Sequence, residues 1–354
     1  MTSAYSSAGL AAVRLQAAVT AGVIDAQTAE KLLPYLTAND VAGQTSVSAD
    51  EEQLRLITGF NDIFVTIGLV LFLGALCYLL AEFGLALATV TAAVACWLLA
   101  EFFTRRKRMA LPSIVLLLAF TGMVLTAAAS LFAKTSQVNF IDAVADNGPA
   151  LSLAALVAAA AAAVHWLRFK VPITVAAGCA ALIIMILTAL SSLSPDLIST
   201  HPAPVFLPLG LLTFAAAMWF DTTDRLRKTR RTDIAFWLHL LAAPLIVHPV
   251  IRSLGVTSGS EPVDALVIIA LFLVLCLVAL VVDRRALLVS SLGYLAYAAY
   301  SLLAATQWSA AASAIAVLTV GALVLMLSAA WRPLRKFAIG IMPAAVRLKV
   351  PEAA

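Results

Sequence analysis

Long apolar runs without charge constrain this chain more than any other feature. The segment 266–282, LVIIALFLVLCLVALVV, is apolar on every face of a helix. The hydrocarbon core of a bilayer is roughly 30 Å thick, and about 20 helical residues cross it. Ten runs of this kind are expected, near 61–82, 84–104, 111–132, 149–168, 171–193, 203–220, 234–252, 263–282, 286–304 and 310–331.

The composition supports this interpretation. Hydrophobic residues make up 63% of the chain, charged residues only 12%, and the mean hydropathy is +1.01. Membrane β-barrels show segments of strict alternation, about ten residues long, which these runs do not resemble. The predicted fold class is therefore all-α: a polytopic integral membrane protein with about ten transmembrane helices.

Basic residues divide unequally between the two sides of these spans. If the N-terminus is cytoplasmic, all 23 Lys and Arg residues fall on the cytoplasmic side except Lys134 and Arg252. Cytoplasmic loops retain such residues, so we expect both termini to be cytoplasmic. The net charge of +4 then reflects topology and an attraction to anionic lipid headgroups, and it requires no nucleic acid.

The first residues differ in composition from the rest. Gly22 is expected to end one short helix, and Asp25 to cap a second helix that begins AQTAEKLL. Such a hairpin is too small for a core of its own, so it packs on the membrane domain, on a copy of itself, on the lipid surface or on a protein partner. The expected divisions are a cytoplasmic helical hairpin at 1–38, a flexible linker at 39–58, the ten-helix domain at 59–332 and a basic cytoplasmic tail at 333–354.

The stretch FWLHLLAAPLIVHP, 236–249, places polar groups inside an expected span. His239 and His248 lie about 7 Å from its midplane and, being nine residues apart, on opposite faces of the helix. Pro244 between them frees the backbone carbonyl of Leu240. Because ionisable groups inside a membrane are functional candidates, His239, Pro244 and His248 form a candidate polar site for a ligand or a proton relay. The alternative is a neutral histidine bonded to a neighbouring helix.

Other charges lie near the ends of spans. Glu101, also in the candidate polar site, precedes Arg105 by four residues, which favours a local ion pair over a carboxylate relay. His165, followed by Trp166 and Arg168, is expected at the interface. The segment DTTDRLRKTRRTD, 221–233, is expected to anchor the topology. Its alternative role is contact with anionic lipid or a protein partner through Arg225, Arg227, Lys228, Arg230 and Arg231.

Signatures of enzymes and metal sites are absent from the sequence. There is no GxSxG, HExxH, P-loop or GxGxxG motif. The four cysteines lie within spans and show no CxxC spacing. We therefore expect no catalytic residue, no metal and no cofactor. The expected function is transport or binding of a small solute or lipid within the bundle; the alternative is a structural or assembly protein whose N-terminal hairpin binds a partner.

Three segments carry a resemblance to a known family. They are DTTDRLRKTRRTDIAFWLHLLAAPLIVHP (221–249), HWLRFKVPITVAAG (165–178) and WRPLRKFAIGIMP (331–343). Together with the opening AGVIDAQTAEKLL, they resemble uncharacterised bacterial inner-membrane proteins related to the DUF2157 group. The resemblance implies a bacterial inner membrane and a cytoplasmic N-terminal helical segment, and it implies no established activity.

Overall fold

The described part of the protein is helical throughout. The computed structural model describes residues 15–33, 60–133, 140–194, 203–224, 227, 229–254, 262–304 and 311–343, without the side chains of 140–146, 262, 263, 301 and 304. No strand occurs within these residues. The predicted all-α fold class is confirmed.

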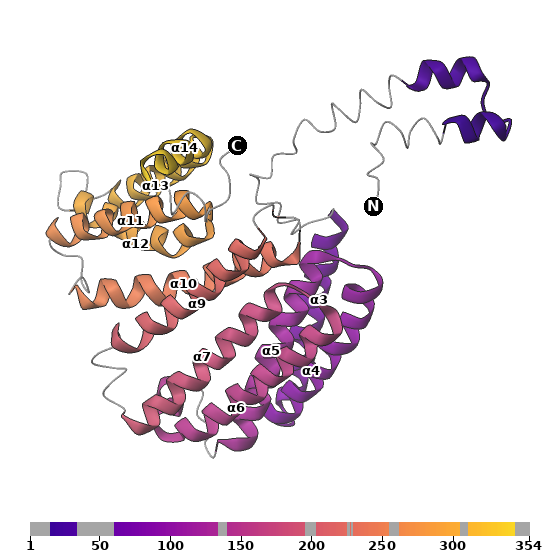
Figure 1. Ribbon diagram of the computed structural model, residues 1–354. Helices are drawn as coiled ribbons and strands as arrows, with labels where there is room; N and C mark the ends of the chain where they lie inside the picture. The colour runs from indigo at the N-terminus through magenta and orange to yellow at the C-terminus, as the bar shows by residue number, and fades with distance from the viewer. Residues whose placement is uncertain are drawn as a thin grey trace. The chain divides into compact units, whose positions relative to one another are not determined.

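The helices of the membrane domain follow one another along the chain (Figure 1). The π-helix η1 directly continues α4. The bounds are α3 Phe60–Ala81, α4 Leu85–Ala100, η1 Glu101–Arg106, α5 Ala110–Phe132, α6 Phe140–Phe169, α7 Ile173–Leu193, α9 Ala203–Thr223, α10 Arg230–Ser253, α11 Pro262–Val282, α12 Ala286–Ala304, α13 Ala312–Ala329 and α14 Trp331–Ile341.

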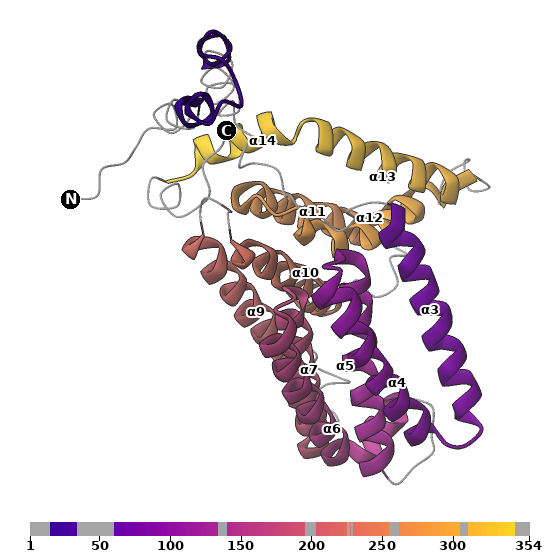
Figure 2. The ribbon, with the colours of Figure 1, turned by 90° about the vertical axis from the view of Figure 1, so that its right-hand side faces the viewer.

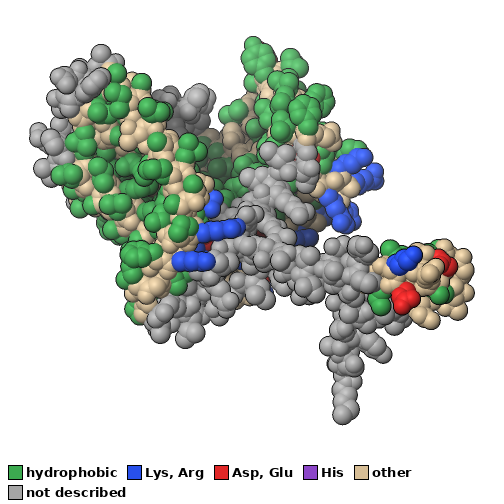
Figure 3. Space-filling model, turned by 90° about the horizontal axis from the view of Figure 1, so that it is seen from above, with side chains coloured by type: hydrophobic (Ala, Val, Ile, Leu, Met, Phe, Trp, Pro, Cys, Tyr) green, Lys and Arg blue, Asp and Glu red, His purple; other side chains and the backbone are tan. Residues whose placement is uncertain are grey.

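Nine helices in the described part are long and apolar enough to cross a membrane. The expected span at 286–304 is helical as α12, but its described apolar stretch, Ala286–Tyr300, is shorter than the others. Hydrophobic side chains cover much of the outer surface, which suits a surface in contact with lipid (Figure 3). The chain is thus a multi-pass membrane protein.

Neighbours in sequence pack against one another in two groups (Figures 1 and 2). The first group is α3 to α7 and the second is α9 to α14, and contacts of α7 with α10 and α9 join them. Glycine permits the close approach of α9 to α10, because a Cβ at Gly210 would lie 3.0 Å from the carbonyl carbon of Leu245. Gly148 of α6 has a similar role, since a Cβ there would lie 2.9 Å from the backbone oxygen of Thr188 in α7.

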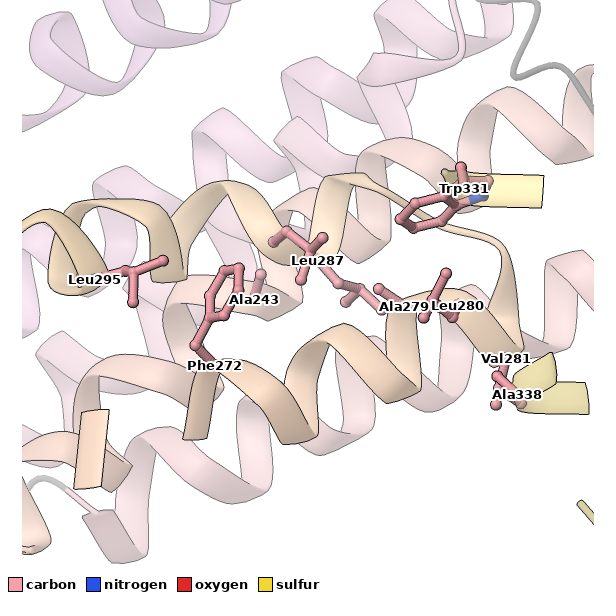
Figure 4. Packing of buried hydrophobic residues seen from close by; sticks show 10 residues of the cluster. Ala243, Phe272, Ala279, Leu280, Val281, Leu287, Leu295, Trp331 and Ala338 are labelled. Carbon is pink, nitrogen blue, oxygen red and sulfur yellow. The ribbon is translucent and has the colours of Figure 1, made fainter. Parts of the chain in front are cut away.

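A buried apolar cluster holds the second group together (Figure 4). Phe272 and Leu280 of α11 meet Leu287 and Leu295 of α12, and Trp331 at the start of α14 packs on the same cluster. Between helices in a bilayer, such packing stabilises the association through van der Waals contacts. α14 is therefore a packed part of the membrane domain.

The helix α14 has two different faces. Trp331, Arg335 and Ala338, four and three residues apart, are buried. Leu334 and Phe337 are exposed on another face. The segment expected to be a basic tail therefore begins as an amphipathic helix, and the last expected span, 310–331, ends at Ala329 of α13.

The N-terminal unit is described only at residues 15–33, where 15–20 and 26–33 are helical. Gly22 has a φ of 68° and lies in the turn between them, which matches its expected role. The Asp25 carboxylate accepts hydrogen bonds from the Thr28 hydroxyl and, at 3.2 Å, from the Thr28 backbone N–H. The hydroxyl bond holds the pKa of Asp25 below its usual value. The predicted cap of the second helix is confirmed.

Candidate functional site

His239 points into the helix bundle. Its side chain is fully buried in the third turn of α10, and Nε2 lies 2.9 Å from Oδ2 of Asp221, near the end of α9. Arg284, in the turn between α11 and α12, donates from Nη2 to Oδ1 of Asp221 and from Nε to Oδ2 at 3.2 Å. The Asp221 carboxylate is therefore shared by an imidazole and a guanidinium.

A second buried carboxylate, Asp283, adjoins Arg284 in the same turn. It accepts a hydrogen bond from Nη1 of Arg227 at 2.5 Å and another from Nε1 of Trp331 at 2.8 Å. Nε of Arg335 lies 3.5 Å from its Oδ1. Asp283 thus connects the α9–α10 segment with both buried polar side chains of α14.

Six ionisable side chains form one buried set, which we call the ionic cluster. Because guanidinium groups keep a fixed positive charge, each carboxylate faces a permanent counter-charge. Separating paired charges in the protein interior is costly, so the cluster fastens α9, α10, the α11–α12 turn and α14 to one another. None of its side chains exceeds 5% exposure: Asp221, Arg227, His239, Asp283, Arg284 and Arg335.

The structure separates the other members of the predicted polar site from His239. Pro244 is exposed, and α10 continues through it. His248 is exposed and its Nδ1 pairs with the hydroxyl of Tyr294 in α12. Glu101 lies in η1 and pairs with Arg168 of α6 at 2.6 Å and with Arg105 at 3.3 Å. The four predicted residues therefore do not form one site.

The predicted basic segment also divides. Arg225 and Lys228 lie outside the described residues. Arg227 turns inward onto Asp283, where a buried carboxylate holds its guanidinium, so this residue does not fit the alternative role of contact with lipid or a partner. Arg230 and Arg231 are both exposed at the start of α10. The helix begins at Arg230, earlier than expected, because the Thr229 hydroxyl accepts a hydrogen bond from Arg231 N at 3.2 Å.

Cationic side chains converge around a cavity of about 580 Å³, which we call the basic cavity. Parts of η1, α5, the α6–α7 connection and α10 form its walls. Apolar side chains such as Phe169 and Trp237 complete the lining. Five cations and one carboxylate line the cavity. Glu101 pairs with two of the cations, Arg105 and Arg168, but positive charge stays in excess and attracts anions. The charged lining residues are Arg105, Arg108, Arg168, Lys170, Arg230 and Asp233.

Two further features of this cavity are typical of ligand sites. Arg108 and Lys170 have φ values of 53° and 56°, a left-handed conformation that residues with a Cβ rarely adopt. The Oγ1 of Thr104, another lining residue, is buried without a hydrogen-bond partner among the described residues. Strained backbone and unsatisfied polar groups concentrate where a protein binds something.

Several of these residues were not predicted from the sequence. Asp221, Asp283 and Arg284 were assigned to loops because they stand at the ends of apolar runs. His165, expected at the interface, is buried between rings of Trp97 and Phe169. The sequence signal that could have indicated these residues is the presence of acidic residues at the inner ends of the spans. An Asp beside an apolar run needs a counter-charge when it is buried.

Metal binding finds no support in the described residues, where no group of three His, Cys, Asp or Glu side chains could hold an ion. Cys77, Cys96, Cys179 and Cys276 are free thiols. Comparison with protein-family models, with curated proteins and with solved structures finds no match to this chain.

Proposed function

We propose that this membrane protein binds a small anionic molecule, or the anionic group of a lipid, within its helix bundle at the basic cavity. The observation that carries the proposal is the convergence of five cationic side chains on one cavity of about 580 Å³. Charge-assisted hydrogen bonds from Arg to anions are among the stronger polar contacts in proteins. Transport of the bound molecule is the extension of this proposal; catalysis forms no part of it.

The proposed orientation puts the basic cavity on the cytoplasmic side. The division of Lys and Arg between the two sides supports this placement, since Lys134 and Arg252 alone fall on the other side. We also propose that the protein lies in a bacterial inner membrane and is related to the DUF2157 group. Both statements are supported by the resemblance of 165–178, 221–249 and 331–343.

A structural or assembly role is the second candidate, and the ionic cluster favours it. Asp221 and Asp283 join four parts of the second helix group, and His239 is bonded within this cluster. In this version the hairpin at 1–38 binds a protein partner or a second copy of the chain. Deleting 1–50 would then abolish the association and leave membrane insertion intact.

Binding of inorganic phosphate to the purified, full-length protein tests the first proposal. We expect saturable binding and a phosphate-dependent rise in the thermal unfolding temperature at constant ionic strength. Arg230→Gln should weaken binding about tenfold or more, because one charge-assisted hydrogen bond contributes roughly 1.5–3 kcal/mol.

Arg231→Gln is the matched control. Arg231 is adjacent, also exposed and equally charged, but it does not line the cavity. Equal effects of the two substitutions, or no saturable binding by the unaltered protein, would reject the proposal.

A further inference from the structure

A second cavity lies farther along the same helices as the basic cavity. This apolar groove, of about 540 Å³, is formed by α4, α5 and one residue of α6. Val90, Val94 and Leu98 of α4 line it and are exposed, so the groove opens toward the region that lipid occupies. Its described lining residues include no charged side chain.

The basic cavity and the apolar groove share one face of α5. Ser113 lines the basic cavity, whereas Phe120, Val124 and Leu131 line the groove. They lie 7, 11 and 18 residues after Ser113, which at about 100° per residue keeps all four within about 20° of one direction. The cavities therefore follow one another along a single stripe of this helix.

The helix α6 repeats the arrangement. Arg168 lines the basic cavity and Val157 lines the groove. These residues are eleven positions apart, about three helical turns, so they too lie on one face. Both helices thus run from the basic cavity to the apolar groove along one face, and Arg168 supplies a cation at the α6 end.

Aromatic rings occupy the junction between the cavities. Phe169 lines the basic cavity, while Trp97 and Phe120 line the groove. The ring centroids of Trp97 lie 5.1 Å from Phe169 and 5.5 Å from Phe120. The lining therefore passes from cationic through aromatic to aliphatic, the order of side chains that suits a path from the headgroup level into the hydrocarbon.

We infer that the ligand of the basic cavity is an anionic phospholipid, whose phosphate lies among Arg105, Arg168 and Arg230 and whose acyl chain lies in the apolar groove. The inference rests on the proposed function and names its ligand. From Ser113 to Val124 the helix rises about 16 Å. One leaflet of hydrocarbon is about 15 Å thick, so an acyl chain is long enough to extend from the basic cavity to the groove.

The test compares two probes, inorganic phosphate and dioleoyl phosphatidylglycerol, on the full-length protein in detergent. Native mass spectrometry follows the lipid, and thermal unfolding follows both probes. Arg230→Gln should weaken the binding of both probes about tenfold, and Arg231→Gln should weaken neither.

A bulky side chain in the groove separates the lipid from free phosphate. Val94→Trp should weaken phosphatidylglycerol binding about tenfold and leave phosphate binding unchanged, because it fills only the groove. Val70→Trp on α3 is the matched control, since Val70 and Val94 are each 54% exposed and Val70 does not line the groove.

Each remaining outcome overturns a distinct statement. Equal lipid affinity of Val94→Trp and Val70→Trp would place the acyl chain elsewhere and overturn the inference. If phosphate binding depends on Arg230 but lipid binding does not, the ligand is a soluble anion. The proposed function would then stand, and the inference of a lipid ligand would fail. If neither probe depends on Arg230, both fail.

Discussion

At the scale of single residues, a carboxylate's surroundings decide what it contributes. Asp221 is buried and bonded to both Arg284 and His239, whereas Glu101 pairs with Arg105 and Arg168 at the partly exposed end of α4. Exposed ion pairs contribute about 0–1 kcal/mol, but removing one partner of a buried pair costs about 3–5 kcal/mol. The two carboxylates should therefore respond differently to neutralisation.

Asp221→Asn should lower the free energy of unfolding by about 3–5 kcal/mol, because Arg284 then stays buried without its counter-charge. Glu101→Gln, the control, should lower it much less, because solvent screens the ion pairs of Glu101. Thermal unfolding of both variants in the same detergent measures the difference. Equal losses would mean that the ionic cluster does not stabilise the fold.

His239 can be tested in the same assay. His239→Gln keeps a side-chain N–H that can donate to Asp221, so its stability should stay near that of the unaltered protein. His239→Leu removes the donor to a buried carboxylate and should cost about 1–3 kcal/mol. A His239→Leu variant that is stable but loses phosphate binding would contradict a structural role for His239 and would indicate that His239 contributes to ligand binding.

The sequence predicts the position of His239 in part. Its place inside a span followed from the apolar residues around it, and its inward orientation from the cost of leaving an imidazole unpaired in lipid. Its hydrogen-bond partner could not be predicted from the sequence, because Asp221 is 18 residues away on another helix. Arg284, which pairs with Asp221, is 63 residues from it. Pairs this distant depend on how helices pack, which hydrophobic periodicity does not specify.

At the scale of helices, composition predicts that a helix is present better than it predicts the residues at which the helix begins and ends. Apolar runs located the spans, including 203–220, which is helical as α9 over Ala203–Thr223. The start of α10 was placed too late, because Asp224 and Thr229 organise the preceding turn: Oδ2 of Asp224 accepts from Thr229 N at 2.8 Å. The basic cavity escaped prediction, since η1, the α6–α7 turn and α10 contribute to it from distant parts of the sequence.

Gly210→Ala tests the contact between α9 and α10. The new Cβ would lie 2.8 Å from Cγ1 of Ile246 and 3.0 Å from the carbonyl carbon of Leu245, so the helices must separate. We expect a loss of about 1–3 kcal/mol in thermal unfolding, the usual cost of overpacking. Gly68→Ala on α3 has open space and should be neutral or stabilising. A Gly210→Ala protein as stable as Gly68→Ala would contradict the described packing.

At the scale of the whole molecule, the protein is a multi-pass membrane protein whose basic side chains are unevenly distributed. Lys and Arg side chains gather in small groups on the face seen from above (Figure 3). The turns at Arg108, Lys170, Arg227 and Asp283 all have left-handed residues. Strained turns persist only where surrounding contacts hold them, so we expect contacts around these four turns to fix their conformation.

The proposed orientation leads to a topology prediction. A reporter inserted after Lys170, between α6 and α7, should give a cytoplasmic signal, since basic connections remain on that side. One inserted at Lys134, between α5 and α6, should give a signal from the opposite side. A periplasmic signal after Lys170 would reverse the orientation or break the span count before that turn.

The most direct measurement is a cryo-electron microscopy structure of the full-length protein in nanodiscs that contain phosphatidylglycerol. The account predicts non-protein density in the basic cavity, with an anionic group about 2.7–3.2 Å from guanidinium nitrogens of Arg105, Arg168 or Arg230. A cavity that holds only water, with these guanidinium groups turned toward solvent, would contradict it.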